Sequence, residues 1–250
     1  MLEFYKKVGL TPLEFINNIK KQYPDTKLCY TARLDPMARG VVPILFGEEC
    51  KNIHNYTKLS KTYEVKIIIG YKTDTDDAMG ILENVILENR LLNNITSSEF
   101  IARYRDFFDF DNGNDNGNDN GNEITINQKY HYFSTKAISA RSKNNSDSFY
   151  HNVKLFSSTI IESGEIDFSE WVNECCSIID KVDKTKNFRQ KEIIEQWQSL
   201  IPDVSKKIQY IKLKLHVGCG FFVRQYSRDI SDKIGIPLMC YDIHRTSIQY

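Results

Sequence analysis

YTARLDPMARG, at residues 30–40, is the stretch from which the rest of the chain can be interpreted. It sets the carboxylate of Asp35 between two arginines and places Pro36 directly after it. Because proline disfavours the α region for the preceding residue, we expect Asp35 in an extended or bridge-like conformation, with its side chain held in one direction. That suits a reactive carboxylate. The same dipeptide also fits Asp35 as the N-cap of a short helix without chemistry, and this stretch alone leaves both open.

The segments around this stretch predict alternating helices and strands. Residues 11–14, Thr-Pro-Leu-Glu, form a capping box with proline at the first helical position, which predicts a helix that stops before Pro24. Residues 41–46 predict a short strand, and residues 48–59 a helix with acidic residues in its first turn. Residues 61–70 alternate with period two and predict a strand. Tyr63 lies on its apolar face, where a tyrosine is also an ordinary β-former.

The rest of the chain carries weaker signals. We predict a helix over 97–108, strands over 130–136 and 153–161, a helical insertion over 167–207, a strand near 211–216 and a helix from Val223 that Gly235 ends. Residues 111–122 are the repeat DNGN-DNGN-DNGN, which lacks the apolar residues that would offset ordering entropy. A disordered loop is therefore expected there, and the spacing does not fit an EF-hand.

Two charged groups outside residues 30–40 invite a functional interpretation. Arg224 lies in the first turn of the last predicted helix, with Arg228 one turn later on the same face. A cation there is unfavourable unless an anion is near, although it can also be a surface arginine without a partner. Asp74, Asp76 and Asp77 could bind magnesium, but aspartates in a Thr-rich loop more often form turns.

Composition is that of an ordinary globular protein. Of 250 residues, 41% are hydrophobic, and 33 Lys and Arg balance 33 Asp and Glu, so nothing in the overall charge indicates nucleic-acid binding. Residues 1–70, however, hold eleven Lys and Arg against seven acids, which allows a local basic patch. Six cysteines without a CxxC pair suggest free thiols. No apolar run approaches the roughly 18 residues of a membrane span, so we expect an intracellular, cytoplasmic protein.

Four stretches, in the right order, resemble the motifs of TruB-type pseudouridine synthases. KKVGLTP at 6–12 is similar to Lys-Pro-x-Gly-x-Thr-Ser, and residues 30–40 with LFGEECK at 45–51 are similar to the Leu-Asp-Pro motif and its extension. KTY at 61–63 with GYKTDTDDAMG at 70–80 matches the Lys-x-Tyr strand and the Thr-Asp-Thr loop, and GFFVR at 220–224 resembles Gly-Thr-Tyr-Ile-Arg. The resemblance covers about half of the chain.

The chain also departs from these motifs. Tyr30 replaces the family's histidine, Arg39 replaces a threonine, and Phe222 replaces a base-contacting tyrosine, which keeps a stacking face but loses the hydroxyl. We also expect the C-terminal PUA domain usual in the family to be absent. These differences bear on substrate choice more than on the reaction.

The resemblance implies an α+β pseudouridine synthase fold, with a mixed, mostly antiparallel sheet flanked by helices, in one catalytic domain over residues 1–250. It implies an isomerase that acts on a uridine in RNA, with the TΨC-loop uridine of tRNA as the first candidate, and no metal or other cofactor. Asp35 would be the nucleophile, Arg224 its ion-pair partner and Tyr63 the ring that stacks on the uracil. Substrate contacts would fall to the following residues: Tyr30, Arg39, Phe222, Lys6 and Lys51, with Lys7 and Arg33 as further phosphate contacts.

The implied partner is RNA, and the implied state is a monomer, with a possible protein partner in place of the PUA domain. Two alternatives remain: a non-catalytic RNA-binding or RNA-folding protein on the same scaffold, and a magnesium-dependent phosphoryl-transfer enzyme that uses Asp74 to Asp77.

Overall fold

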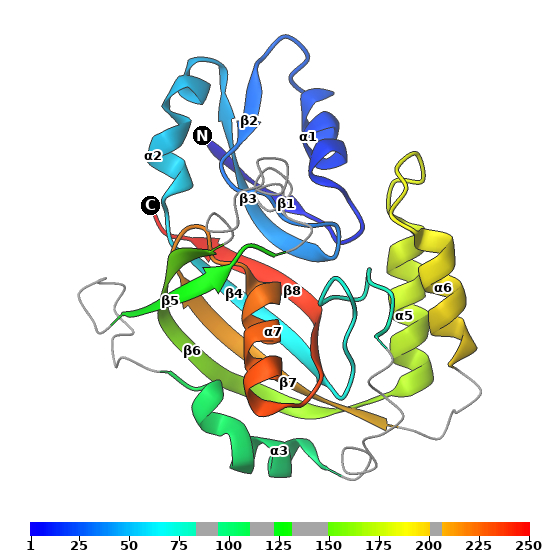
Figure 1. Ribbon diagram of the computed structural model, residues 1–250. Coiled ribbons are helices and arrows are strands. Elements are labelled where there is room, and N and C mark those ends of the chain that lie inside the picture. Colours follow the sequence, from blue (N-terminus) through cyan, green and yellow to red (C-terminus); the bar gives the residue numbers. More distant parts are fainter. Residues whose placement is uncertain (84–94, 111–122, 132–149, 201–206) are drawn as a thin grey trace.

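The computed structural model describes residues 1–83, 95–110, 123–131, 150–200 and 207–250 (Figure 1). The loop predicted at 111–122 and most of the strand predicted at 130–136 lie outside these residues. Within the described part of the chain, no helix is long and apolar enough to cross a membrane.

One mixed sheet of eight strands forms the centre of the described structure. The strand order is β1-β3-β8-β4-β7-β6-β5, and β2 pairs with β3. All pairings are antiparallel except that of β3 with β8, which confirms the predicted mixed, mostly antiparallel sheet. The strands are β1 (Leu2–Lys6), β2 (Leu28–Tyr30), β3 (Ala38–Phe46), β4 (Lys61–Ile69), β5 (Ile124–Lys129), β6 (Tyr150–Asp167), β7 (Lys207–Val217) and β8 (Leu238–Ile248).

Helices flank this sheet. They are α1 (Pro12–Lys20), η1 (Gly47–Asn52), α2 (Ile53–Thr57), α3 (Ser97–Tyr104), η3 (Arg105–Phe107), α5 (Phe168–Asp180), α6 (Gln190–Ser199) and α7 (Val223–Ile234). The predicted capping box of α1 is present, with Thr11 and Glu14 bonding each other's backbone N–H groups. Figure 1 shows α7 across one face of the sheet and α5 beside α6 at its edge.

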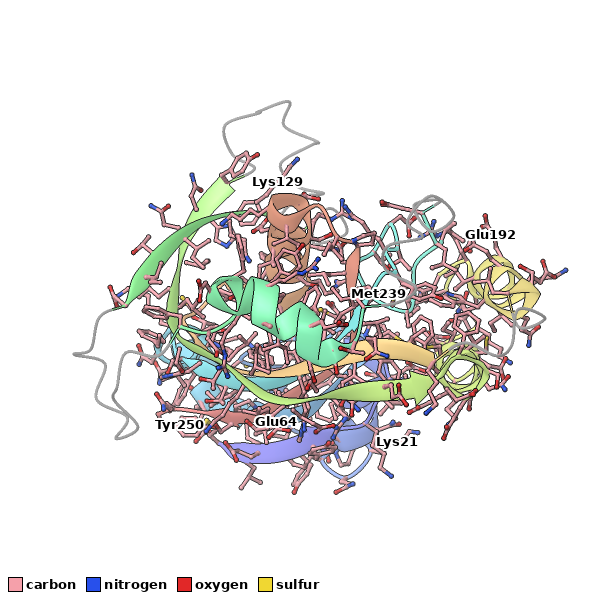
Figure 2. The ribbon with its side chains drawn as sticks, turned by 90° about the horizontal axis from the view of Figure 1, so that it is seen from below. Lys21, Glu64, Lys129, Glu192, Met239 and Tyr250 are labelled. Carbon is pink, nitrogen blue, oxygen red and sulfur yellow. The ribbon has the colours of Figure 1, made fainter. Side chains whose placement is uncertain are left out.

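Two apolar clusters lie on opposite faces of the sheet. On one face, Tyr63, Val65 and Ile67 of β4 pack in the same cluster as Val223 and Tyr226 of α7. The second cluster joins sheet residues of the other face to α5 and α6. Figure 2 shows Glu64, whose neighbours in β4 face α7, on the side of the sheet opposite that helix. Along residues 62–66 the period-two pattern thus places polar side chains opposite the apolar face, whereas Ile68 joins the second cluster.

Several predicted bounds are wrong. Tyr130 and His131 are not in a strand, since β5 ends at Lys129. Residues 48–59 begin as a 3-10 helix and turn α-helical only at Ile53. The strands β1, β2, β5 and β8 were not predicted, because their place depends on pairing between distant parts of the chain.

Candidate active site

Asp35 and Arg224, 189 positions apart in the sequence, form an ion pair in the structure. Arg224 Nη2 lies 2.5 Å from Asp35 Oδ2. Asp35 sits in a turn between β2 and β3, where its carbonyl accepts the N–H of Ala38 at 3.0 Å. It caps no helix, so the alternative of a helix N-cap does not apply. The Arg224 side chain is 13% exposed and that of Asp35 is 54% exposed, so the carboxylate is open to a substrate while its partner is buried.

A second carboxylate binds the same guanidinium. Arg224 Nη1 lies 3.0 Å from Asp77 Oδ2 and donates to the carbonyl of Thr75 at 3.0 Å. Asp77 is buried, and its other oxygen accepts hydrogen bonds from Thr75 Oγ1 at 2.7 Å and the Met79 N–H at 3.0 Å. Arg224 therefore bridges an exposed aspartate and a buried one, and the buried aspartate fixes its direction.

The electrostatics differ at the two ends of this bridge. The protein around Asp35 disfavours its charge, but exposure of the side chain limits this cost, and Arg224 holds the pKa of Asp35 below its usual value. At Asp77 burial outweighs the attraction of Arg224, and the pKa of that carboxyl is raised. Burial disfavours the charge of Arg224 too, but the two aspartates raise its pKa. Asp35 is thus kept ionised at neutral pH.

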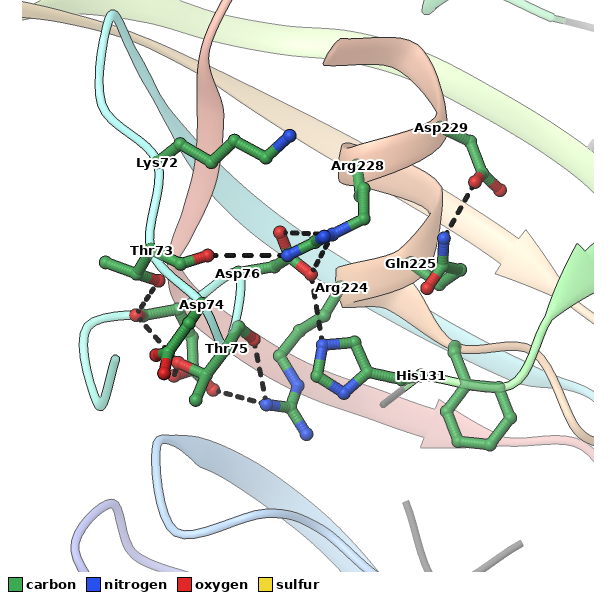
Figure 3. Close-up of polar contacts among 12 residues, drawn as sticks. Lys72, Thr73, Asp74, Thr75, Asp76, His131, Arg224, Gln225, Arg228 and Asp229 are labelled. Atoms are coloured by element: carbon green, nitrogen blue, oxygen red, sulfur yellow. Dashed lines mark hydrogen bonds and ion pairs between the residues drawn. The ribbon is translucent and has the colours of Figure 1, made fainter. Parts of the chain in front are cut away.

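One turn along α7, Arg228 pairs with another buried aspartate of the same loop, Asp76 (Figure 3). Arg228 Nε donates to both oxygens of Asp76, at 2.8 and 2.7 Å, and His131 Nε2 lies 3.1 Å from Asp76 Oδ2. Asp76 is fully buried and has a φ of 57°, a left-handed conformation that is uncommon outside glycine. Its carbonyl accepts the N–H of Cys240 at 2.9 Å. The loop after β4 is therefore tied to α7, to β8 and to the segment that follows β5.

Two buried cations hold the turn that carries Asp35. Lys6 Nζ donates to the carbonyls of Asp35 at 3.0 Å and Ala38 at 2.7 Å. Arg245 is fully buried and donates to the carbonyls of Val41, Arg33 and Ala32 at 2.7, 3.3 and 3.2 Å. The predicted role of Lys6 as a phosphate contact is wrong for this structure, because its ammonium group is buried and bound to the backbone.

Burial of Lys6 predicts a pH dependence of stability. Burial lowers the pKa of its ammonium group from 10.5 to about 8, although Asp35 opposes the shift. Between these values the unfolded chain binds more protons than the folded one, so stability should rise with pH. We expect the free energy of unfolding of the wild type, relative to Lys6→Met, to rise from pH 8 to pH 10 in urea titrations. A difference that stays flat or falls would contradict the burial of a charged ammonium group.

The other predicted site residues differ in how far they are buried. Tyr63 is buried on the face of the sheet that α7 covers, and Phe222 is the half-buried N-cap residue of α7. Tyr30 ends β2, half-buried, with the guanidinium of the exposed Arg33 5.4 Å from its ring centre. Lys51 is exposed and pairs with Glu48 at 2.5 Å.

Arg39 lies on the other face of the sheet. Its guanidinium forms a double hydrogen bond with Asp242, at 3.0 and 2.8 Å, and donates to Tyr5. His244, its register partner in β8, and Glu64 share that face. The structure therefore does not bring Arg39 to Asp35, because alternation along β3 points it to the other face, and its role in substrate binding stays a prediction.

Sequence reasoning missed one contact that orients Arg224. The buried side chain of Gln128 in β5 accepts the Phe222 N–H at 2.8 Å and donates to the Phe222 carbonyl at 2.9 Å. His151 Nε2 lies 2.9 Å from the carbonyl of Gly220. Residues of β5 and β6 thus hold the turn before α7 through hydrogen bonds to its backbone. No local pattern in the sequence indicates this role of Gln128. The aspartates at 76 and 77, by contrast, stand out in the sequence, and they bind Arg228 and Arg224.

The three loop aspartates are engaged by protein donors. Asp74 binds Arg189 at 2.7 Å, Asp76 binds Arg228, and Asp77 binds Arg224. Among the described residues, no group of three or more His, Cys, Asp or Glu side chains is arranged to hold a metal ion. These contacts assign the loop to the positioning of arginines.

The structure is an α+β protein in which an exposed aspartate meets a buried arginine beside a mixed sheet, and comparisons with known proteins show what it is similar to. The model of the TruB family pseudouridylate synthase N-terminal domain matches residues 20–107. The tRNA pseudouridine synthase B of Bacillus pumilus is 32% identical over 107 residues, 43% of this chain and 34% of the relative. That of Bacillus subtilis is 36% identical over 80 residues, 32% of this chain and 26% of the relative.

Solved structures agree on the fold. A Cbf5-Nop10-Gar1 complex matches with a TM-score of 0.52 and 13% identity, over 98% of this chain and 47% of that chain. An H/ACA RNP bound to a substrate RNA containing 2'-deoxyuridine matches with a TM-score of 0.52 and 12% identity, over 98% of this chain and 45% of that one. Over residues 20–107 the chain is therefore similar to the TruB family of pseudouridine synthases, and the matched segments span about a quarter to a third of the length of these curated relatives.

Proposed function

We propose that this protein isomerises a uridine in RNA to pseudouridine, with Asp35 as the nucleophile. The observation that carries the proposal is the bridge by Arg224 between the exposed Asp35 and the buried Asp77. A protein that only binds RNA gains nothing from an ionised carboxylate at its RNA-binding face, since it repels phosphates. A reactive carboxylate, by contrast, must be ionised, held in one direction and accessible.

The reaction breaks the bond between N1 of uracil and C1′ of ribose and joins C1′ to C5. Attack by Asp35 displaces the uracil and leaves the sugar fragment on the carboxylate. The uracil then turns, C5 takes the place of N1, and the carboxylate leaves. C5 loses its proton and N1 gains one, so the product is an isomer of the substrate. Arg224 holds the carboxylate throughout and favours it as the leaving group.

Two aromatic residues are proposed to hold the base. The target uridine must leave its stack to reach Asp35. Tyr63, on the same sheet face as α7, is proposed to stack on the uracil and to provide a route for removing the C5 proton, and Phe222 to cover the other side. Because Phe222 lacks the hydroxyl of tyrosine, it offers a stacking face without a hydrogen bond.

The proposed substrate is the TΨC-loop uridine of tRNA. The relatives named tRNA pseudouridine synthase B support tRNA as the RNA class. The exposed cations Lys7, Arg33 and Lys51 remain the proposed phosphate contacts, with Tyr30 beside Arg33. A monomer, with or without a protein partner, is the proposed working form.

A tritium-release assay tests the proposal. The substrate is a tRNA transcript labelled at C5 of uridine, because joining C5 to the ribose releases that proton to water. We expect release by the wild type and none by Asp35→Ala. If neither protein releases tritium while both bind the transcript, the alternative of a non-catalytic RNA-binding protein replaces this proposal. Equal release by both would contradict the role of Asp35.

A further inference from the structure

The connection between β6 and β7 is a pair of helices placed at the end of a hairpin. Asp167, the last residue of β6, is the register partner of Lys207, the first residue of β7. Between them the chain forms α5 and α6, which pack together through Trp171 and Trp197. Two antiparallel strands that meet in register need only a short turn. The helices are therefore not required to close the sheet.

These helices bury the apolar side of the loop after β4. Tyr71, Met79 and Leu82 belong to the same buried cluster as Trp171 and Trp197. The ring centre of Tyr71 lies 5.2 Å from that of Trp171. Figure 1 shows this loop, in cyan, between α7 and the α5–α6 pair. The loop thus has its apolar side chains on α5 and α6, and its carboxylates on α7.

Polar contacts fasten the two ends of the loop to α6. Gln196 accepts the N–H of Leu82 at 2.7 Å and donates to the Leu82 carbonyl at 3.3 Å. Arg189, the N-cap residue of α6, donates to both oxygens of Asp74, at 2.7 and 3.2 Å. Asp74 in turn accepts the N–H of Ile81 at 2.9 Å, and Thr73 pairs with Leu82 across the base of the loop.

Between these fastened ends lie Asp76 and Asp77, which bind Arg228 and Arg224. We propose that the α5–α6 pair positions Arg224 through this loop, with Gln196 and Arg189 as positioning residues for the reaction. This inference rests on the proposed function. The helices serve as a fixed support for the active site.

The test compares single-residue variants of α6 in the full chain. In Gln196→Leu the Leu82 N–H and carbonyl lose their partner, and in Arg189→Gln the double hydrogen bond to Asp74 is lost. We expect the single-turnover rate of pseudouridine formation to fall about tenfold in each, because small displacements of reacting groups cost rate. RNA affinity should be unchanged, since the side chains of Gln196 and Arg189 are bound to the loop after β4 and are not among the proposed phosphate contacts. Gln198→Leu, the same substitution at an exposed position of α6, should match the wild type.

Hydrogen exchange of the peptide covering residues 71–83 provides a readout that does not depend on activity. We expect faster exchange in Gln196→Leu and Arg189→Gln, and wild-type exchange in Gln198→Leu. Faster exchange with an unchanged rate, or a lower rate in the Gln198→Leu control as well, would overturn the inference. A wild type that forms no pseudouridine would contradict the proposed function. Unchanged exchange in both α6 variants would instead show that Gln196 and Arg189 do not hold the loop after β4.

Discussion

In Asp35→Asn we expect pseudouridine formation to fall by at least about 10⁴-fold, the order seen when a covalent nucleophile is removed. Asparagine keeps the size of the side chain and can still accept a hydrogen bond from Arg224. It cannot form and release an ester with C1′, because a neutral amide is a poor nucleophile. RNA affinity should stay the same or rise slightly, since a negative charge leaves the RNA-facing side. Single-turnover assays and equilibrium binding of the same transcript measure the two effects.

Asp242→Asn is the matched control for this variant. Asp242 is also an aspartate in an ion pair with an arginine, but it binds Arg39 on the opposite face of the sheet. We expect its activity to remain near that of the wild type. A similar loss in both variants would mean that Asp35 contributes general charge to the fold, and an active Asp35→Asn would remove it from the chemistry.

The fold was predictable where local pattern and tertiary packing agree. The alternation of residues 61–70 placed β4 correctly, because one face of that strand is apolar and buried. The capping box gave the start of α1 for a purely local reason. By contrast, β8 reads as a mixture of apolar and charged residues, because its two faces meet a core along one half and solvent along the other. Its place between β3 and β4 follows only from pairing across the chain.

The site, like the fold, was predictable only in part from the sequence. Asp35 and Arg224 were predicted as partners from motifs far apart in the sequence, and the structure places them in contact. Lys6 was predicted to contact phosphate from the excess of cations in residues 1–70, and nothing in the local sequence indicates the carbonyls that its ammonium group binds. Arg39 was predicted to contact the substrate from the same charge excess, whereas alternation along β3 points it to the other face of the sheet. Residue type and order predict which groups meet, whereas the direction of each side chain requires the sheet.

Arg224→Lys is expected to lower the rate by about 10²-fold or more, although the positive charge is kept. The guanidinium reaches Asp35 with Nη2 and Asp77 with Nη1, and a single ammonium group cannot span both carboxylates. Lysine would be drawn to one aspartate and leave the other without its partner. Because Arg224 holds the pKa of Asp35 low, its loss should raise that pKa, and the acidic limb of the pH–rate profile should move to higher pH.

Arg39→Lys is the corresponding control, since Arg39 also forms a double hydrogen bond with an aspartate. Its rate and pH profile should stay near those of the wild type. The same transcript and single-turnover conditions serve both variants. If Arg224→Lys keeps full activity, the bridge between Asp35 and Asp77 is a structural ion pair only. If its rate falls with an unmoved acidic limb, Arg224 acts on the substrate and not through the charge of Asp35.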